Sequence, residues 1–333
     1  MLEEPKIPHQ PIIDSLNHDY GICASHITFL PLGADSSAAV YRAEADGIAY
    51  FVKLRWGLFD QNSVQLSHAL SEQTDGAVIG PNTGKSGQPW RTLDAYTLVV
   101  YPFVEGKDGY QTPLTTQNWL DFGRAVKLIH TARIPENIVQ SISRETYSDD
   151  IRKQVRSALA VIPKSDFPDP ISRQLADFLK QNHQEIIQLA DRAEALAHKL
   201  RNQESEFVLC HSDLHAGNIL IDGNGALFIV DWDNPIYAPK ERDLMYPGGA
   251  LGFTGHTPEE EETLFFEGYG QTEIDSSTIT YYRTERVLAD VASFCDEILS
   301  TNQAGEDRKQ SLRYLKSNFL PGSTVDRANA HDQ

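Results

Sequence analysis

Short hydrophobic runs separated by turn residues fill the first hundred positions of the chain, and they predict a small antiparallel sheet. Asp46-Gly47 is a dipeptide typical of a two-residue hairpin, and it separates two segments of alternating apolar and polar residues. Alternation places Lys53 on one face of the second strand and Val52 and Leu54 on the other. The predicted elements are strands at Ile27–Leu32, Ala38–Ala45, Ile48–Arg55 and Tyr96–Val104, with helices at 11–20 and Gln61–Glu72.

The hydrophobic spacing changes to that of helices after residue 115. Apolar side chains then recur three or four positions apart, which places them on one helix face. Thr257, Pro258 and Glu260 form a helix-start signal, because threonine caps, proline suits the first turn and glutamate completes a capping box. The polar tail from Ser323 to Gln333 predicts a frayed end. Helices are predicted at Thr115–His130, 149–161, 169–182, 184–202, 258–269, 276–300 and 307–318.

A strand-rich segment, Phe207–Asp233, interrupts these helices. It reads as an apolar strand, a polar loop, a second strand, a Gly-Asn-Gly turn and a third strand that ends at Asp231. The whole pattern predicts an α+β fold with two lobes. A small β-rich lobe spans residues 1–104, residues 105–110 form a linker, and a larger helical lobe with an embedded β-hairpin spans residues 105–333.

The polar residues of this segment have the spacing of a phosphoryl-transfer site. The loop carries Asp213 and Asn218 five residues apart, and hairpin pairing can bring Asn218 beside Asp231. A carboxylate and an amide oxygen suit Mg²⁺, which usually keeps waters and substrate phosphates as its other ligands. Asp213 would then be free to orient a hydroxyl group and accept its proton, with Lys53 upstream on a strand.

Composition narrows the class of partner. The net charge is -18, from 29 Lys and Arg against 47 Asp and Glu, which argues against nucleic acid or an anionic membrane and favours a cationic small molecule. Three widely spaced cysteines form no pairing framework, which is typical of a reducing compartment. No apolar run approaches the roughly 20 residues of a membrane span. We expect a cytoplasmic protein that is a monomer or a weak homodimer.

Several stretches resemble one known family, the aminoglycoside phosphotransferases, which share the protein-kinase-like fold. They are HSDLHAGNIL, VDWDNPIYAPKERDLM, FEGYG and the Tyr-Tyr-Arg around Tyr282, and they are most similar to the branch that acts on spectinomycin. The resemblance implies an ATP-dependent O-phosphotransferase for an aminoglycoside or aminocyclitol antibiotic, conferring resistance. Kinases of other hydroxylated metabolites, such as choline, homoserine or methylthioribose, are the alternative. A non-catalytic nucleotide-binding protein is the second alternative.

The resemblance also implies roles for individual residues. Asp213 would be the catalytic base, Asn218 and Asp231 would bind Mg²⁺, and Lys53 would hold the ATP phosphates. GTP is not excluded, because the hinge expected to receive the base acts through backbone groups. The hinge residues are Pro102, Phe103 and Val104; the supporting residues are His211 and Asp243; the acceptor-binding candidates are Asp233, Tyr282 and Glu285.

The sequence alone leaves three features of the site undecided. The loop with Gly33, Ser36 and Ser37 has one glycine only, although its short side chains and amides could approach phosphates. Protein kinases pair the strand lysine with a helix glutamate, and here Gln61 stands near that place, with Asp60 or Glu72 as substitutes. A zinc site is the rival interpretation of one cluster, but Gly217 makes a helical HxxxH chelate unfavourable; the cluster is Cys210, His211 and His215.

Overall fold

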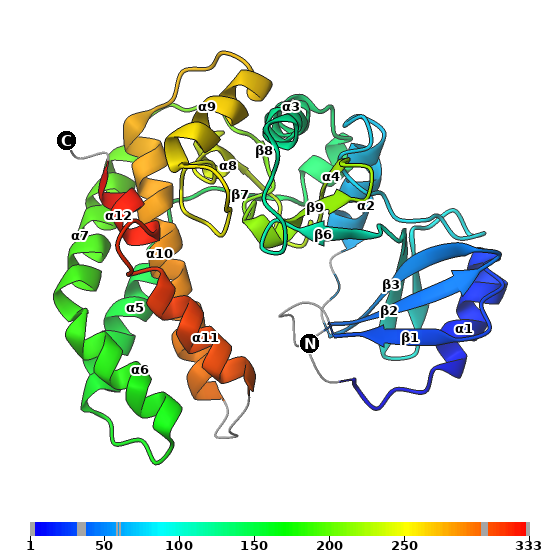
Figure 1. The fold of residues 1–333 in the computed structure, drawn as a ribbon, viewed down its shortest axis with the longest axis horizontal. Helices are drawn as coiled ribbons and strands as arrows, with labels where there is room; N and C mark the ends of the chain where they lie inside the picture. The colour runs from blue at the N-terminus through cyan, green and yellow to red at the C-terminus, as the bar shows by residue number, and fades with distance from the viewer. Residues whose placement is uncertain (1–3, 32–37, 58, 60, 301–305, 331–333) are drawn as a thin grey trace. The chain divides into compact units, whose positions relative to one another are not determined.

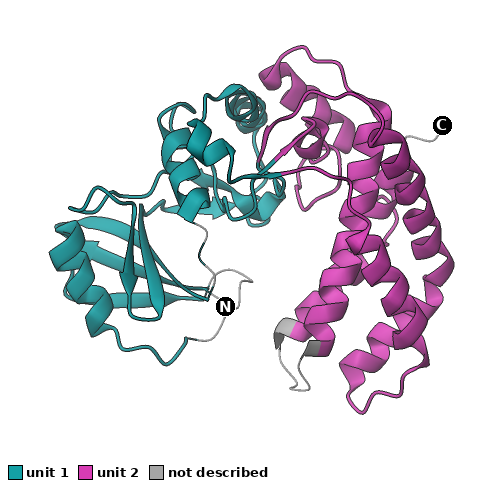
Figure 2. Ribbon diagram, turned by 180° about the vertical axis from the view of Figure 1, so that it is seen from behind, with its two compact units in different colours: residues 1–143, 211–236 teal, residues 144–210, 237–333 magenta. Residues whose placement is uncertain are grey.

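A computed structural model describes residues 4–31, 38–57, 59, 61–300 and 306–330. The chain forms two compact units (Figure 2): unit 1 comprises residues 1–143 and 211–236, and unit 2 comprises residues 144–210 and 237–333. Antiparallel strands near the N-terminus and helices towards the C-terminus confirm the predicted α+β class. The units divide the chain differently from the two expected lobes, so the lobe boundary near residue 104 stays a prediction.

A five-stranded antiparallel sheet with the strand order β1-β2-β3-β5-β4 forms one end of unit 1 (Figure 1). Helix α1 (Gln10–Ser15) and the π-helical turn after it, Leu16–Tyr20, pack on one face of this sheet and bury their apolar side chains there. The strands are β1 (Ile27–Leu30), β2 (Ala38–Ala45), β3 (Ile48–Trp56), β4 (Trp90–Leu93) and β5 (Tyr96–Pro102).

The predicted hairpin and its face assignment are confirmed. Asp46 and Gly47 have φ values of 53° and 78°, the left-handed conformations that a two-residue hairpin turn requires. Val52 and Leu54 are fully buried in the core beneath α1, whereas Lys53 belongs to the opposite face of β3. The lysine side chain is therefore directed away from the hydrophobic core of this sheet.

Unit 1 also contains a second sheet, with the order β10-β9-β6, which holds the embedded hairpin (Figure 1). Strands β9 (Ile219–Asp222) and β10 (Leu227–Ile229) pair antiparallel, and β6 (Gly106–Asp108) pairs with β9. Asn118, at the start of α3 (Thr116–Thr131), donates to the Gly225 carbonyl at 2.8 Å and so fastens this helix to the hairpin turn. The unit's other helices are α2 (Gln61–Ser71) and α4 (Glu136–Val139).

Strands β4 and β6 were not predicted. Trp90–Leu93 is a short edge strand whose pairing with β5 follows a turn at Asp94, a residue with a φ of 49°. Residues 106–108 lie within the segment expected to be a linker, and they carry no apolar alternation that would indicate a strand. Gly106 is needed because a Cβ there would lie 2.5 Å from the Ile221 carbonyl oxygen.

Unit 2 is a helical core with a small three-stranded sheet, in the order β7-β11-β8, beside it. Helix α9 begins with the predicted capping box of Thr257 and Glu260. For residues 323–330 the predicted frayed tail is wrong, because Val325 and Ala328 of α12 are buried in this core; the last three residues of the tail lie outside the described residues. The elements are β7 (Ser143–Arg144), α5 (Asp150–Val161), α6 (Pro170–Gln181), α7 (His183–Leu200), β8 (Val208–Cys210), β11 (Ile236–Ala238), α8 (Glu241–Leu244), α9 (Pro258–Tyr269), α10 (Ser276–Ser300), α11 (Glu306–Ser317) and α12 (Thr324–Asn329).

Across the described residues, no helix combines the length and the apolar character that a membrane span requires.

Candidate active site

The polar loop before β9 and the end of β10 lie side by side in unit 1, as the hairpin predicted. The amide of Val230 donates to the Asn218 carbonyl at 3.0 Å, which continues the β9–β10 ladder beyond the two strands. Asn218 ends a single 3₁₀ turn, Ala216–Asn218, and its amide donates to the His215 carbonyl at 2.9 Å. The hairpin therefore sets the register that pairs Asn218 with Val230, the residue before Asp231.

His211 joins the two sides of this arrangement through both ring nitrogens. Nδ1 accepts the Asp213 amide at 3.2 Å, so in the neutral ring the proton belongs to Nε2, which lies 2.9 Å from the Val230 carbonyl oxygen. The ring also meets Trp232 edge-on, with 4.6 Å between centroids. These contacts hold the start of the loop against the end of β10.

Two residues of the site have left-handed backbone conformations without being glycine. Ser212 has a φ of 70° and Asp231 has a φ of 66°. Such conformations cost about 1–3 kcal/mol and persist where the surroundings over-determine them. Here the Ser212 hydroxyl donates to the Asn234 carbonyl at 2.7 Å, which secures one of the two positions. The two strained positions are thus the residue before the candidate base Asp213 and the candidate metal ligand Asp231 itself.

Asp213 and Asn218 are coupled through a backbone contact. The Asn218 side-chain amide nitrogen donates to the Asp213 carbonyl at 2.8 Å, which leaves its Oδ1 as the atom suited to a cation. The Asp213 carboxylate is 37% exposed, and its Oδ2 lies 3.6 Å from Nε2 of His215. The loop thus places a carboxylate that solvent or a substrate can reach beside a buried amide.

Lys53 extends from β3 to the two carboxylates that follow β10. Its Nζ lies 2.9 Å from Oδ2 of Asp233 and 3.6 Å from Oδ1 of Asp231. Arg55, two residues further along the same face of β3, lies 3.1 Å from Oδ2 of Asp233. Segments far apart in the sequence therefore meet around Lys53. Both of its carboxylate partners, Asp231 and Asp233, follow β10.

The two carboxylates of this cluster differ in how far the neighbouring cations offset the effect of burial on their pKa. Burial raises the pKa of Asp231, although Lys53 opposes that effect. Burial also acts on Asp233, but Lys53 and Arg55 outweigh it and hold the pKa of Asp233 below its ordinary value. Asp233 is therefore an ionised counter-ion shared by two cations. That engagement argues against Asp233 as a ligand for a protonated acceptor.

The partners described for Lys53 are Asp231 and Asp233, and of the residues expected near the following helix only Gln61 and Glu72 are described. Gln61 and Glu72 are both exposed at the ends of α2, and Asp60 lies outside the described residues. The buried face of α2 presents small and apolar side chains, among them Ser67, which is hydrogen-bonded to Tyr101. Burial raises the pKa of Tyr101 to about 12, so its hydroxyl group is neutral at physiological pH.

The structure describes some of the predicted nucleotide-binding residues and not others. The Phe103 amide donates to the Ala49 carbonyl at 3.2 Å, and the Arg42 guanidinium lies over the Phe103 ring at 4.5 Å. Pro102 has no amide hydrogen, so of the three hinge residues Val104 is the one whose amide suits a nucleobase. Gly33, Ser36 and Ser37 lie outside the described residues.

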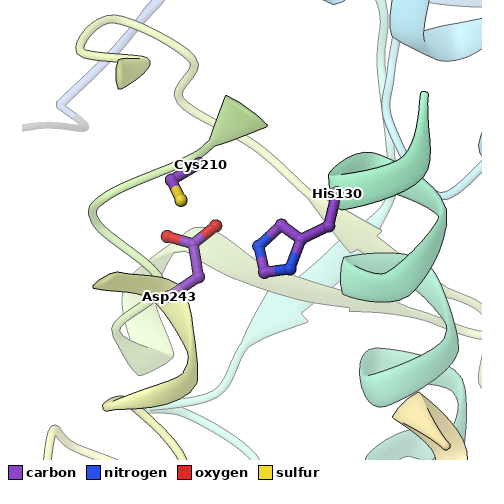
Figure 3. A group of neighbouring side chains, drawn as sticks. All are labelled: His130, Cys210 and Asp243. Atoms are coloured by element: carbon purple, nitrogen blue, oxygen red, sulfur yellow. The ribbon is translucent and has the colours of Figure 1, made fainter. Parts of the chain in front are cut away.

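Zinc binding by His211 is not supported, because both of its ring nitrogens are hydrogen-bonded to backbone groups. Burial, reinforced by Asp243, raises the pKa of the Cys210 thiol well above its ordinary value, which disfavours the thiolate that zinc requires. Figure 3 shows the Cys210 sulfur beside the Asp243 carboxylate in unit 2; the third residue drawn, His130, belongs to unit 1. Asp243 is fully buried, and its bracing role stays a prediction.

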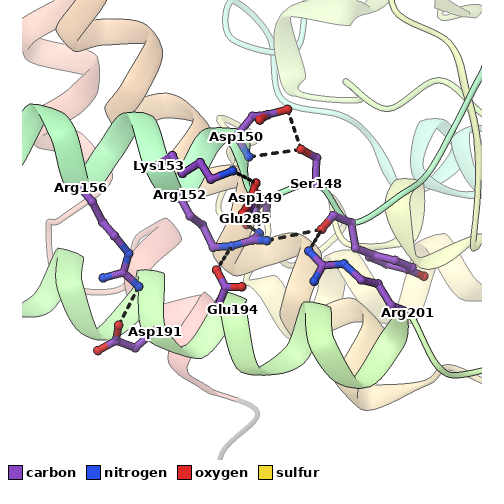
Figure 4. A network of polar contacts seen from close by, with 11 residues as sticks. Ser148, Asp149, Asp150, Arg152, Lys153, Arg156, Asp191, Glu194, Arg201 and Glu285 are labelled. Atoms are coloured by element: carbon purple, nitrogen blue, oxygen red, sulfur yellow. Dashed lines mark hydrogen bonds and ion pairs between the residues drawn. The ribbon is translucent and has the colours of Figure 1, made fainter.

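Of the acceptor-binding candidates on α10, Glu285 is paired with an arginine within unit 2 (Figure 4). Arg152 donates to both carboxylate oxygens of Glu285, at 2.8 and 3.0 Å, and to Glu194 at 2.9 Å. Tyr282 is fully buried, with the Arg242 guanidinium 5.2 Å from its ring centroid. A carboxylate neutralised by an arginine is not available to a protonated amine, so Glu285 is better explained as a structural residue.

This network gives a stability prediction with a control on the same helix. Arg152→Ala leaves the buried Glu285 carboxylate unpaired, and we expect a loss of about 3–5 kcal/mol in the free energy of unfolding. Arg156→Ala removes an exposed pair with Asp191, at 2.7 Å, and the expected loss is about 1 kcal/mol or less. Denaturant unfolding of both variants measures the difference. Equal losses would show that Arg152 is not the central residue of this core.

Comparisons with known proteins show the family of this chain. A family model described as the phosphotransferase enzyme family APH matches residues 28–273, and the chain belongs to that family. It is therefore a protein-kinase-like phosphotransferase with an alcohol group as acceptor.

Two solved structures are similar over nearly the whole chain. Spectinomycin phosphotransferase APH(9)-Ia, in complex with ADP and spectinomycin, has a TM-score of 0.91 and 34% sequence identity, with 98% of this chain and 99% of that chain covered. Its AMP-bound complex has a TM-score of 0.87 and 33% identity, with 98% and 100% covered.

Protein StrN of Streptomyces griseus is 26% identical over 224 residues, which are 65% of this chain and 67% of StrN. A microcompartment-associated aminopropanol kinase, with a TM-score of 0.64 and 17% identity over 97% of this chain and 98% of its own, shares the fold alone.

Proposed function

We propose that this protein transfers the γ-phosphoryl group of ATP to a hydroxyl group of an aminocyclitol similar to spectinomycin, with Mg²⁺ as the metal. The main observation behind the proposal is the ion pair between Lys53 and Asp231 in unit 1, which also contains the loop with Asp213 and Asn218. Likeness over the whole chain to a phosphotransferase whose structure contains ADP and spectinomycin supports the same assignment.

The residues present fit a magnesium ion. Asp231 and Asn218 offer oxygen atoms, and Asn218 has its amide nitrogen turned to the Asp213 carbonyl. A cation beside Asp231 would favour its ionised form and offset the effect of burial on its pKa. When bound, the metal would supply positive charge that neutralises the phosphates during transfer.

The residues of this chain divide the remaining work. Lys53 would bind the nucleotide phosphates, and Asp233, which is itself paired with Arg55, would hold the lysine side chain in place. Val104 would donate its amide to the base. Asp213 would accept the proton of the acceptor hydroxyl as the new oxygen–phosphorus bond forms and ADP departs. His211 would keep the loop and the end of β10 in register.

An acceptor panel tests the proposal. The purified protein, ATP and Mg²⁺ are combined separately with spectinomycin, other aminocyclitols and aminoglycosides, choline, homoserine and methylthioribose, and the release of ADP is measured, with GTP as a second donor. We expect turnover with spectinomycin and a product heavier by one phosphoryl group. Cationic acceptors are favoured by the net charge of -18. Turnover with a metabolite and none with spectinomycin would redirect the assignment to a metabolic kinase.

A further inference from the structure

An imidazole ring, that of His215, lies near the carboxylate of the proposed base. Nε2 of His215 is 3.6 Å from Oδ2 of Asp213, a separation typical of an electrostatic contact rather than a hydrogen bond. The two groups lie two residues apart in the same loop, and both are part of unit 1. The proposed function assigns no role to this histidine.

The hydrogen bonds of the ring determine which atom faces the carboxylate. Nδ1 of His215 accepts the backbone amide of Gly217 at 3.0 Å. A nitrogen that accepts an N–H group carries no proton of its own, so in the neutral ring the proton belongs to Nε2. His215 therefore presents an N–H donor, and not a lone pair, to Asp213.

Tyr110 holds the ring in this orientation. Its ring stacks on His215 with 5.8 Å between centroids and 26° between planes, and its hydroxyl oxygen lies 3.3 Å from Nδ1. Both rings pack closely against Gly217, because a Cβ there would lie 2.7 Å from Cε2 of Tyr110 and 2.9 Å from Cε1 of His215.

Tyr110 is itself fixed by the strand β6 that precedes it. Its amide donates to Oδ1 of Asp108 at 3.0 Å. The neighbouring Gly109 amide donates to the carbonyl oxygens of Ala216 and Ile219, at 2.8 and 3.0 Å. A Cβ at Gly109 would lie 2.9 Å from the Ala216 carbonyl oxygen, so the two segments require this close approach. The end of β6 is thus joined by its backbone to the loop that carries Asp213.

We infer that His215 and Tyr110 form a positioning pair that sets the orientation of the Asp213 carboxylate for proton acceptance. This inference rests on the proposed function. Nε2, with its proton, lies 3.6 Å from Oδ2 and stabilises negative charge on that oxygen electrostatically, which makes Oδ1 the more basic of the two and the one to receive the hydroxyl proton. Tyr110 fixes the plane of the imidazole, and β6 fixes Tyr110. Neither residue exchanges a proton with the acceptor.

A kinetic series separates this role from a purely structural one. For His215→Ala we expect kcat to fall about 10- to 100-fold, because a misplaced catalytic group loses that much, while KM for ATP stays unchanged. His215→Gln restores part of kcat because it retains an N–H donor. Tyr110→Phe keeps the stacked ring and stays near wild type, whereas Tyr110→Ala loses activity. His198→Ala, an exposed histidine on α7, is the control.

Coupling to the proposed base is the decisive readout. In an Asp213→Asn background, His215→Ala should have no further effect on the residual rate, since its role acts through that carboxylate. Unchanged kcat in His215→Ala, a loss confined to KM for ATP, or an equal loss in the Asp213→Asn background would each overturn the inference. If His215→Ala does not fold, Tyr110→Ala and His215→Gln carry the same comparison. Full activity of Asp213→Asn itself would instead overturn the proposed function.

Discussion

Replacing Asp213 with asparagine should lower kcat by about 10²–10⁴-fold, the usual contribution of a positioned general base. Asparagine has a similar shape but cannot take up the hydroxyl proton at neutral pH. The backbone contacts of residue 213 with His211 and Asn218 do not involve its carboxylate, so the loop should keep its conformation. Steady-state kinetics with the best acceptor, together with nucleotide binding by calorimetry, measures the effect.

Asp222→Asn is the matched control for this variant. Asp222 is a carboxylate at the turn of the same hairpin, where it accepts the amides of Asn224 and Ala226 at 2.8 Å each. It is remote from the proton-transfer step, so kcat should stay near wild type. If Asp213→Asn lost nucleotide binding as well as turnover, a structural role for Asp213 would explain the result better than base catalysis.

Asp231→Asn should have the second large effect. It removes the carboxylate that is proposed to hold Mg²⁺ and that lies 3.6 Å from Lys53, and we expect a loss of about 10²–10³-fold in kcat. The concentration of Mg²⁺ needed for half-maximal activity should also rise, because one charged ligand is lost. Activity measured across a magnesium titration tests both expectations.

The neighbouring Asp233 provides the comparison for Asp231. Asp233→Asn removes the closer partner of Lys53, at 2.9 Å, and frees Arg55 from its contact with the same oxygen. Its main effect should be a higher KM for ATP with little change in the magnesium requirement. If Asp233→Asn raised the magnesium requirement more than Asp231→Asn did, the two carboxylates would have exchanged roles.

Local signals explain why much of the fold could be predicted. Asp46-Gly47 formed the expected turn because both residues tolerate left-handed backbone, and Thr257 with Glu260 formed the expected helix start. The pairing of Asn218 with Val230, the residue before Asp231, was also predictable, because a hairpin with a short turn has a determined register. Each of these features depends on residues close together in the chain.

Features that depend on distant segments were missed. Strand β6 carries no apolar alternation, and it forms because its backbone pairs with β9. Lys53 pairs with Asp233, and periodicity along one segment contains no signal for such a contact. Glu285 was expected to bind a cationic acceptor, but its partner Arg152 is on another helix. The contact of Tyr110 with His215 belongs to the same class.

The most direct test of the central claim is phosphoryl transfer from ATP to spectinomycin, followed by mass spectrometry and ³¹P NMR of the acceptor. The wild-type protein should produce a single phosphate ester on one hydroxyl group in the presence of Mg²⁺, and Asp213→Asn should produce it at the greatly reduced rate given above. Absence of any phosphorylated acceptor with the wild-type protein, or equal rates for the two proteins, would contradict the account.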